Sequence, residues 1–254
     1  MRLKDKVIVV TGGASGLGKT FSVALAAEGA KVAVCAHSSD TKPAVNEIKR
    51  NGGEAIGIKV DVRDVKSTEQ MAAKTKDAFG KIDVLIANAG IYGQLKPQPF
   101  ENINPEEWDW VMAVNLKGPF LSARAVLPYM REQKKGNIVI VSSVFWLVGR
   151  LPCMHYAVTK AGEMGMMRQM AAQLASDNIR VNAFLPGGTW DEATEKFVSH
   201  LPPGSDDALV NQMQLRHRKL MPEDLVGGIV FLASDESDMM TGQVLPVDGG
   251  IVFY

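Results

Sequence analysis

Cysteine is scarce in this sequence of 254 residues: only Cys35 and Cys153 are present, and they lie far apart. They form no metal-type spacing, and Cys35 lies in an apolar run, where a small core residue is the expected role. Among the histidines, His155, His200 and His217 also lack the spacing of metal ligands. The sequence therefore predicts that the protein uses no metal ion.

An excess of charge and long hydrophobic runs are missing as well. Lys and Arg number 28 and balance 28 Asp and Glu, with no run of like charge. This balance gives no support for nucleic acid or an anionic membrane as a partner. The first apolar run, Val7 to Val10, is too short for a signal-peptide core, and no later run is long enough to span a bilayer. We therefore expect a cytoplasmic protein.

What the sequence does contain is an alternation of apolar, strand-like runs with amphipathic, helix-like segments. Short continuous apolar runs suit strands that are buried on both faces of a parallel sheet. Their alternation with helices implies right-handed crossovers and a doubly wound arrangement. We predict one α/β domain over residues 1–254, with a Rossmann-type parallel sheet of seven strands. The predicted strands are 6–11, 31–36, 55–60, 82–88, 137–143, 180–185 and 243–247, and the main predicted helices are 17–28, 43–51, 67–79, 116–132, 156–175 and 222–233.

The first predicted strand leads into a glycine-rich turn, Thr11 to Gly18. Gly12, Gly16 and Gly18 fall where a strand turns sharply into a helix, and the missing side chains let the backbone come close to a pyrophosphate. The helix N-terminus adds free N–H groups and the positive end of a dipole. The turn predicts a dinucleotide site, with a glycine-rich turn that binds nothing as the alternative.

A tyrosine and a lysine stand four residues apart in a predicted helix, at Tyr156 and Lys160. Side chains at this spacing project from one face and lie within reach of each other. An ammonium near a phenol favours the phenolate, so we expect the pKa of Tyr156 to fall from about 10 toward working pH. Such a phenol can pass a proton to or from an alcohol oxygen by general acid–base catalysis.

With these motifs the sequence resembles, from end to end, the short-chain dehydrogenase/reductase family in its single-domain form. Ser143, thirteen residues before Tyr156, matches the family spacing better than Ser142 does. The family often has Asn-Asn-Ala-Gly where this sequence has Ala87 followed by Asn88-Ala89-Gly90, and we judge the position of Ala87 to be structural. The motifs that appear in family order are residues 11–18, Asp61-Val62, Asn88-Ala89-Gly90, Asn115, Ser143 with Tyr156 and Lys160, Arg180-Val181-Asn182-Ala183 before Pro186-Gly187, and Thr241-Gly242 with Asp248-Gly249-Gly250.

The resemblance implies an oxidoreductase that moves a hydride between a nicotinamide cofactor and the carbonyl or secondary alcohol of a substrate. Tyr156 is then the general acid or base, and Ser143 hydrogen-bonds the same substrate oxygen. Lys160 lowers the Tyr156 pKa, binds the nicotinamide ribose and passes the proton toward a water held by Asn115. For Asn115, a buried amide with satisfied hydrogen bonds is the alternative. The direction of the reaction stays open.

The resemblance also implies the residues that hold the cofactor. Asp61 and Val62 end the third strand, where relatives cradle the adenine; a turn or helix-capping role is the alternative for Asp61. The position that often carries a carboxamide-binding Thr holds Asp191 instead, so Thr189 and Thr194 are the candidates for that task. The predicted cofactor-binding set is Gly12, Ser15, Gly16, Leu17, Gly18, His37, Ser38, Asp61, Val62, Asn88, Ala89, Gly90, Tyr156, Lys160, Pro186, Gly187 and Thr189.

The end of the second strand bears on the choice between NADP(H) and NAD(H). An NAD-selecting relative carries an Asp there for the ribose hydroxyls, but this sequence has Ala36 followed by His37 and Ser38. No carboxylate repels a 2′-phosphate, and these polar side chains can hydrogen-bond it. Against this, Ser15 stands where many NADP-using relatives have a base. We favour NADP(H), with NAD(H) as the alternative.

Bulky apolar residues predict where the substrate binds. The expected pocket residues are Tyr92, Phe145, Trp146, Met154 and Trp190, which favour a small apolar or aromatic carbonyl over a sugar or nucleotide. The segment 190–220, with two prolines and a glycine at its middle, is predicted to be a mobile lid over the substrate.

Relatives pair through two of the predicted helices, 116–132 and 156–175, so we expect a homotetramer or a homodimer. The apolar C-terminal residues 250–254 are expected to be buried against a neighbouring subunit. Two alternatives to a carbonyl reductase remain. One is an NAD-dependent alcohol dehydrogenase that works in the oxidising direction, and the other is a non-catalytic nucleotide-binding protein on the same fold.

Overall fold

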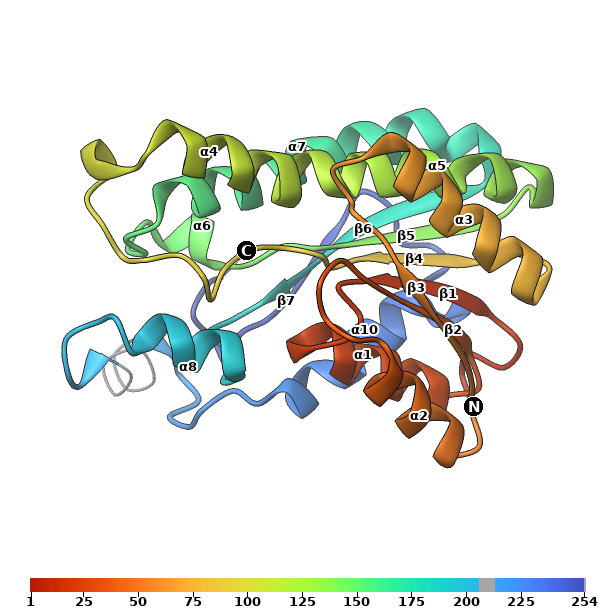
Figure 1. The fold of residues 1–254 in the computed structure, drawn as a ribbon, viewed down its shortest axis with the longest axis horizontal. Coiled ribbons are helices and arrows are strands. Elements are labelled where there is room, and N and C mark those ends of the chain that lie inside the picture. The colour runs from red at the N-terminus through yellow and green to blue at the C-terminus, as the bar shows by residue number, and fades with distance from the viewer. Residues whose placement is uncertain (206–212, 254) are drawn as a thin grey trace.

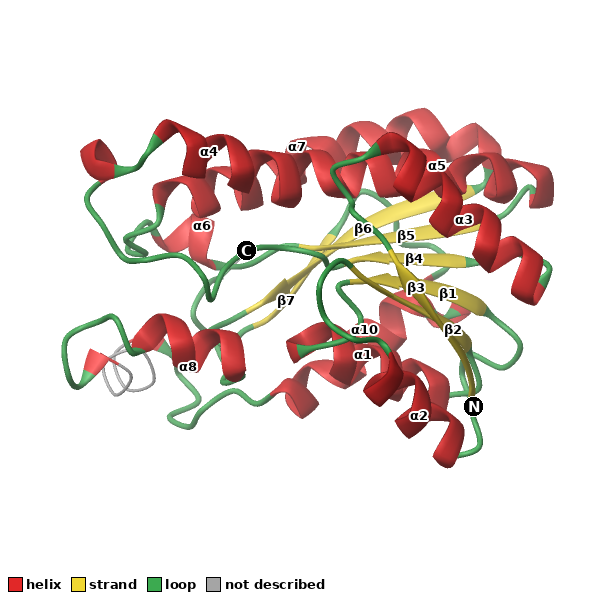
Figure 2. Cartoon of the chain, in the orientation of Figure 1, coloured by secondary structure: helices red, strands yellow, loops and turns green. Residues whose placement is uncertain are grey.

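Seven parallel strands form one sheet at the centre of the molecule, in the order β3-β2-β1-β4-β5-β6-β7. The structure is a computed structural model that describes residues 1–205 and 213–253. Figure 2 shows the strands as one twisted layer between two layers of helices. The strands are β1 (Val7–Thr11), β2 (Lys31–Ala36), β3 (Glu54–Lys59), β4 (Val84–Ala87), β5 (Gly136–Val141), β6 (Ile179–Pro186) and β7 (Val244–Val247). The predicted doubly wound parallel sheet is confirmed.

The two helical layers follow from the two-residue period of the strands. In β1, Ile8 and Val10 pack into the core cluster on one face, whereas Val9 packs into the cluster on the other. In Figure 1, α1 (Gly16–Ala27), α2 (Lys42–Arg50) and α10 (Val226–Ala233) lie below the sheet. The upper layer consists of α3 (Val65–Phe79), α5 (Gly118–Gln133) and α7 (Met154–Leu174). Both faces of the sheet are therefore covered, as its continuous apolar strands require.

The start of α3 shows how the sequence sets a helix boundary. The Asp64 side chain accepts a hydrogen bond from the Ser67 N–H at 2.7 Å, which satisfies a backbone donor that lacks a partner inside the helix. At the other end, Gly80 adopts a left-handed conformation with φ 80°, which favours glycine. The helix therefore begins two residues before the predicted range and ends where it was predicted.

Within residues 1–205 and 213–253, three short α-helices lie outside the main predicted ones: α4 (Pro105–Val111), α6 (Phe145–Val148) and α8 (Glu192–Val198). Asn104 caps α4 by accepting from the Glu106 N–H at 2.9 Å, and Pro105 occupies its first turn. Between α4 and α5 lies η2 (Met112–Lys117), a π-helical turn. The predicted helix 116–132 therefore begins inside this wider turn. A π-helical turn carries no hydrophobic signature of its own, so the sequence pattern did not indicate it.

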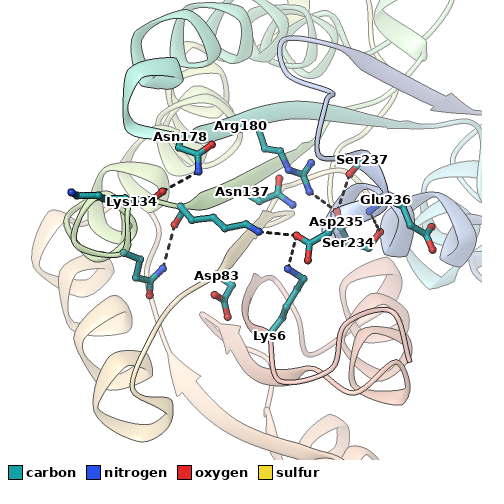
Figure 3. A network of polar contacts seen from close by, with 12 residues as sticks. Lys6, Asp83, Lys134, Asn137, Asn178, Arg180, Ser234, Asp235, Glu236 and Ser237 are labelled. Atoms are coloured by element: carbon teal, nitrogen blue, oxygen red, sulfur yellow. Dashed lines mark hydrogen bonds and ion pairs between the residues drawn. The ribbon is translucent and has the colours of Figure 1, made fainter.

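A polar network closes the edge of the sheet where the strands begin (Figure 3). The Asp235 carboxylate accepts from Lys6 at 3.0 Å and lies 3.2 Å from the Lys135 ammonium. Arg180, at the start of β6, donates to the Ser234 carbonyl at 2.6 Å and to the Leu232 carbonyl at 3.1 Å. These contacts join the starts of β1, β5 and β6 to the end of α10. They leave the opposite edge of the sheet, where the strands end, to form the site described next.

No helix within the described residues is long and apolar enough to cross a bilayer.

Candidate active site

A cavity of about 540 Å³ opens at the carboxyl ends of the strands. Its walls come from the segments that follow β1 to β6, on both sides of the boundary between β1 and β4, where the strand order reverses. In an open parallel sheet this boundary is the usual place for a ligand, because the connections on its two sides run to opposite faces and leave a crevice. The cavity is therefore the candidate active site.

The glycine-rich turn forms the floor of the cavity at the N-terminus of α1. Gly12 has φ 65°, and a Cβ at this position would lie 3.0 Å from the Ala89 Cα. A Cβ on Gly18 would overlap the Gly12 carbonyl oxygen. The first turn of α1 contains no acidic residue, and the Ser15 side chain makes no capping hydrogen bond. Free N–H groups and the positive end of the dipole thus face a cradle formed largely by glycine backbone, which fits a pyrophosphate. The Asp191 carboxylate borders this cradle, since a Cβ on Gly16 would lie 3.0 Å from its Oδ2.

One end of the cavity is polar and contains the Arg63 guanidinium, a charged group that was not predicted from the sequence. Asp61 binds the Arg63 guanidinium, with Oδ2 2.7 Å from Nη2 and Oδ1 2.9 Å from Nε. The hydrogen bond from Arg63 lowers the pKa of Asp61 to about 2. His37 Nε2 lies 3.7 Å from Asp61 Oδ2, and His37, Ser38 and Arg63 all line the cavity. Asp61 does not cap α3, because Asp64 does.

The segment that follows β4 forms the part of the cavity wall next to the glycine-rich turn. The Thr11 hydroxyl accepts from the Asn88 N–H at 3.0 Å and from the Ala89 N–H at 3.1 Å, which holds this segment against β1. The Asn115 side chain then fixes the next residue: its Oδ1 accepts from the Ile91 N–H at 2.7 Å and its Nδ2 donates to the Ile91 carbonyl at 3.1 Å. Asn115 is fully buried and does not line the cavity.

Ser143, Tyr156 and Lys160 come together on one wall of the cavity. Ser143 follows β5, and its hydrogen bond to the Tyr156 phenol favours the phenolate. Tyr156 and Lys160 lie one turn apart in α7, with the Lys160 ammonium 5.8 Å from the Tyr156 ring centre. All three residues are at least nine-tenths buried in the protein. A phenol, a hydroxyl and an ammonium in this arrangement can hold an oxygen atom and exchange a proton with it.

The Lys160 ammonium makes its direct contacts away from the phenol. Nζ donates to the Val141 carbonyl at 2.9 Å and to Glu163 Oε1 at 3.0 Å. Burial disfavours the charge of Lys160, but Glu163 and Tyr156 outweigh this effect and raise the Lys160 pKa. For the Glu163 carboxyl, burial has the opposite effect and raises the pKa to about 7, while the neighbouring lysine acts to lower it. Glu163 belongs to no motif of the sequence analysis.

The expected fall of the Tyr156 pKa does not occur in the cofactor-free protein. Burial raises the pKa of Tyr156, and it outweighs Lys160 and the Ser143 hydrogen bond, both of which lower it. Glu163 raises it further, because its carboxylate offsets the charge of Lys160. The expectation considered one lysine and left out both the burial of the phenol and a second charge. At neutral pH, Tyr156 is therefore a protonated phenol that can act as an acid.

Two of the five predicted substrate residues, Tyr92 and Phe145, line the cavity. Tyr92 lies against Tyr156, with ring centres 5.1 Å apart, and stacks on Phe197 at 4.8 Å. Its burial raises the pKa of Tyr92, so this phenol stays protonated. Phe197 belongs to α8, so this stack brings the predicted lid segment into contact with the wall of the cavity that contains Tyr156. Residues 206–212 of that segment lie outside the described residues.

The other three predicted pocket residues do not line the described cavity. Trp146 packs against the core cluster above the sheet. Met154 is 40% exposed and borders a separate shallow hollow beside Pro99. Trp190 lies beneath the Lys219 ammonium, which is 3.9 Å from its ring. The sequence placed these residues near the site but could not tell which way their side chains turn.

Every residue of the predicted cofactor-binding set lines the cavity. Thr189 and Thr194, the candidates for the carboxamide, also line it, as does Asp191, which caps α8 by accepting from the Thr194 N–H at 2.9 Å. The lining residues that the sequence analysis did not single out include Arg63, Gly93, Gln94, Trp110 and Val114. Arg63 and Val114 adjoin the motif residues Val62 and Asn115, and Gly93 and Gln94 lie in the stretch from Tyr92 to Leu95 that we expect to contribute to substrate specificity, so only Trp110 had no signal in the sequence.

Comparisons with known proteins agree with this geometry. A family model described as "Enoyl-(Acyl carrier protein) reductase" matches residues 12–252. A 3-oxoacyl-(acyl-carrier-protein) reductase of Thermotoga maritima is 39% identical, over 99% of this chain and 100% of its own. An L-rhamnose 1-dehydrogenase (NAD(P)(+)) of Azotobacter vinelandii is 36% identical, over 99% of this chain and 98% of its own.

The solved structures agree as well. The crystal structure of a levodione reductase superposes with a TM-score of 0.91 at 33% identity, covering 98% of each chain. The sequence of levodione reductase from Leifsonia aquatica is 35% identical over 98% of this chain and 95% of its own. The chain belongs to the short-chain dehydrogenase/reductase family. As a short-chain dehydrogenase/reductase, it is an oxidoreductase that uses NAD(P)(H) and acts on CH–OH or C=O groups.

The tight glycine turn of this short-chain dehydrogenase/reductase generates a test. We expect Gly18→Ala to lower the free energy of unfolding by about 1–3 kcal/mol, because the new methyl group overlaps the Gly12 carbonyl. NAD(P)H affinity should fall about tenfold or more as the turn shifts. Denaturant titration and fluorescence titration with NADPH and NADH measure the two effects.

Gly227→Ala is the matched control for this substitution. Gly227 lies in α10, and a Cβ there meets nothing within 4 Å. The control should leave cofactor affinity unchanged and keep or raise stability by up to about 1 kcal/mol. Equal stability and affinity in the two variants would contradict the close approach at Gly18.

Proposed function

We propose that this protein is a carbonyl reductase that uses NADP(H) to reduce a small apolar or aromatic ketone, with Tyr156 as the general acid. The observation that supports this most is the convergence of Ser143, Tyr156 and Lys160 on one wall of a cavity whose floor is the glycine-rich turn. The pyrophosphate of the cofactor would bind at the N-terminus of α1. The nicotinamide would lie between Pro186-Gly187 and the Tyr156 wall, with Thr189 or Thr194 at its carboxamide.

The bound nicotinamide supplies the hydride, and the protein's own residues manage the proton. The Ser143 hydroxyl donates a hydrogen bond to the substrate oxygen and so holds the carbonyl in place. Tyr156 gives its phenolic proton to the same oxygen as negative charge develops there. The Lys160 ammonium then faces a phenolate and stabilises it until a proton returns. Oxidation of the alcohol would use the same contacts in reverse, with the phenolate as base.

Asn115 acts in this proposal as a positioning residue. Both polar atoms of its side chain are bound to the Ile91 backbone, at 2.7 and 3.1 Å. This pairing fixes the cavity wall between Gly90 and Tyr92. The predicted water between Asn115 and Lys160 would then have to be held by other atoms, so the satisfied buried amide is the better account of the side chain.

The charge of the site favours the protonated form of Tyr156, the form that acts in reduction. Burial and Glu163 keep the Tyr156 pKa above its ordinary value, so the phenol carries a proton at neutral pH. A protonated phenol is ready to donate to an alkoxide, whereas oxidation first requires its deprotonation. The cofactor-free site is therefore prepared for carbonyl reduction.

The polar end of the cavity supports NADP(H). The position of the ribose-binding acid holds Ala36, and His37, Ser38 and Arg63 line the wall beside it. Asp40, the nearest acid in sequence, is exposed and accepts from the Lys42 N–H at 3.0 Å, so it does not take over that position. The Arg63 guanidinium adds a permanent positive charge for a 2′-phosphate.

One observation favours the alternative, an NAD(H)-dependent dehydrogenase that oxidises an alcohol. Asp61 is ionised at neutral pH and also lines this end of the cavity. Its carboxylate would repel a 2′-phosphate, and Ser15 offers no charge to compensate. The bond to Arg63 balances the Asp61 charge, so we place NADP(H) first.

The substrate side of the cavity supports an apolar or aromatic ketone. The apolar and aromatic residues that line the cavity include Ile91, Tyr92, Trp110, Val114 and Phe145, and the Tyr92 ring lies against that of Tyr156. Aromatic and aliphatic walls stabilise a ligand by removing apolar surface from water. We propose that α8 acts as part of the lid, since the Tyr92–Phe197 stack joins it to this wall.

We predict that Tyr156→Phe lowers turnover at least about a hundredfold, because the general acid is lost, while NADPH binding stays nearly intact. Single-turnover reduction of the best ketone from a panel, followed at the NADPH absorbance, measures the first effect, and fluorescence titration the second. Lys160→Met should lower turnover and cofactor affinity together. Tyr129→Phe, which removes a phenol outside the cavity, is the control; near-normal turnover in Tyr156→Phe would show that another group is the acid.

We predict that Ala36→Asp shifts the cofactor preference toward NAD(H). The new carboxylate repels a 2′-phosphate and offers acceptors to the ribose hydroxyls. A change of about 1–3 kcal/mol, roughly five- to a hundredfold in relative efficiency, is the scale for one charged contact. The measurement is kcat/KM for NADPH and NADH in both proteins. An unmodified protein that already prefers NADH would place the alternative first.

We also propose that the protein is a homotetramer or a homodimer that pairs through α5 and α7. Phe120 on α5 and Val158 on α7 are 46% and 41% exposed, and Phe253 near the C-terminus is 80% exposed. Exposed apolar groups on neighbouring helices favour burial against a second copy.

Light scattering should therefore give a multiple of the 27.5 kDa chain mass, and Phe120→Asp should move the protein toward the monomer. Met239→Asp is the control. Met239 is 96% exposed and lies beside the polar network at the edge of the sheet where the strands begin. A monomer mass for the unmodified protein at micromolar concentration would exclude the proposal.

A further inference from the structure

Glu163 is a buried carboxylate that the reaction outlined above does not use. It is 1% exposed, and its Oε1 accepts from the Lys160 ammonium at 3.0 Å. Its Oε2 is buried and has no hydrogen-bond partner within the described part of the chain. A buried charge with one unsatisfied oxygen is unfavourable unless something compensates for it. The position therefore calls for a reason beyond packing.

The surroundings of Glu163 contain few other charges. Within α7 it faces Lys160 and, beyond it, Tyr156. From β5 and the residues after it, the described part of the chain contributes the Val141 carbonyl, which accepts from Lys160 at 2.9 Å, and Ser142. The Ser142 hydroxyl donates to the Lys160 carbonyl at 2.9 Å, and its hydrogen bond to Glu163 lowers the Glu163 pKa. From the segment before α8, Asp191 acts on Tyr156 as a more distant negative charge. Lys160 is thus the main link between Glu163 and the phenol.

The effect of this link has a definite sign. The positive charge of Lys160 favours the Tyr156 phenolate, whereas the carboxylate of Glu163 disfavours it. The carboxylate also holds the ammonium at the end of β5, where Nζ is 5.8 Å from the centre of the phenol ring. While Lys160 stays protonated, an ammonium without this partner would act on the phenol with no opposing carboxylate beside it.

We propose that Glu163 is a positioning residue of the active site, which holds Lys160 against the end of β5 and offsets its charge so that Tyr156 keeps its proton. Glu163 thereby biases the site toward donating a proton to a carbonyl oxygen rather than accepting one from an alcohol. This inference rests on the proposed function for its catalytic meaning. The effect of Glu163 on the ionisation of Tyr156 concerns the cofactor-free protein and does not depend on that function.

The ionisation of Tyr156 tests the proposal directly. Tyrosinate absorbance near 295 nm is followed against pH in the cofactor-free protein and in Glu163→Gln, with the same protein carrying Tyr156→Phe subtracted from each. Glu163→Gln keeps an oxygen that can accept from Lys160 but removes the negative charge. We expect the ratio of tyrosinate to phenol at a given pH to rise about tenfold or more, a downward shift of at least one pH unit.

Two further variants separate charge from packing. Glu163→Asp keeps the carboxylate and should leave the Tyr156 ionisation within about threefold of the unmodified protein. Glu107→Gln is the control for removing a carboxylate near the same helix, since Glu107 binds His155 at 3.0 Å and Gln98 at 2.8 Å rather than Lys160. Circular dichroism at each pH restricts the comparison to folded protein. If Glu163→Gln does not fold, the Glu163→Asp titration still decides: a shift beyond tenfold without loss of charge overturns the proposal.

An unchanged or upward-shifted Tyr156 ionisation in Glu163→Gln would overturn the proposal and leave Glu163 as a structural partner of Lys160. With a ketone substrate in hand, Glu163→Gln should also move the pH at which reduction declines downward by the same amount. A protein that reduces no ketone but shows the expected titration would refute the proposed function and not the role of Glu163.

Discussion

The parallel direction of all seven strands is the constraint on which the rest of the structure depends. Because every strand runs the same way, every loop that leaves a carboxyl end reaches the same edge of the sheet. Segments that are far apart in sequence, such as Gly12, His37, Asn88, Ser143 and Gly187, therefore meet around one cavity. The other edge is free to be closed by ion pairs and helix ends. The common direction of the strands therefore places the cavity at one edge of the sheet and the ion pairs that close the sheet at the other.

Helix α7 connects the core to the chemistry of this edge. It buries Met164 and Met167 in the cluster above the sheet, and its first two turns present Tyr156 and Lys160 to the cavity. The sheet in turn supplies the Val141 carbonyl to the lysine. An ammonium in this interior needs acceptors, and the end of β5 and Glu163 provide them. The acid–base behaviour of the phenol is thus set by the packing of a helix on a strand as much as by the motif itself.

The sequence was a good guide wherever a residue's role follows from its backbone position. Strands and glycine turns are of this kind, so the sheet and the cofactor floor were predicted closely. Side-chain direction is not: Trp146, Met154 and Trp190 are near the site in sequence but turn into the core, to a shallow hollow or beneath Lys219. Glu163 was missed because a charge three residues after Lys160 reads as an ordinary helical pair until its burial is known. The balance between burial and charge at Tyr156 depends on distances that no spacing rule supplies.

The π-helical turn η2 makes the length of this segment as important as its composition. It spans Met112–Lys117 and holds Asn115 against Ile91. A turn of this kind accommodates one more residue than an α-helical turn. Loss of a single residue here would let the wide turn close to an ordinary α-helical turn, so α5 would keep its phase with the sheet while the contact of Asn115 with Ile91 would be lost. Among descendants of this gene, a one-codon deletion in η2 would therefore be felt at the cavity wall that Asn115 fixes rather than in the packing of α5.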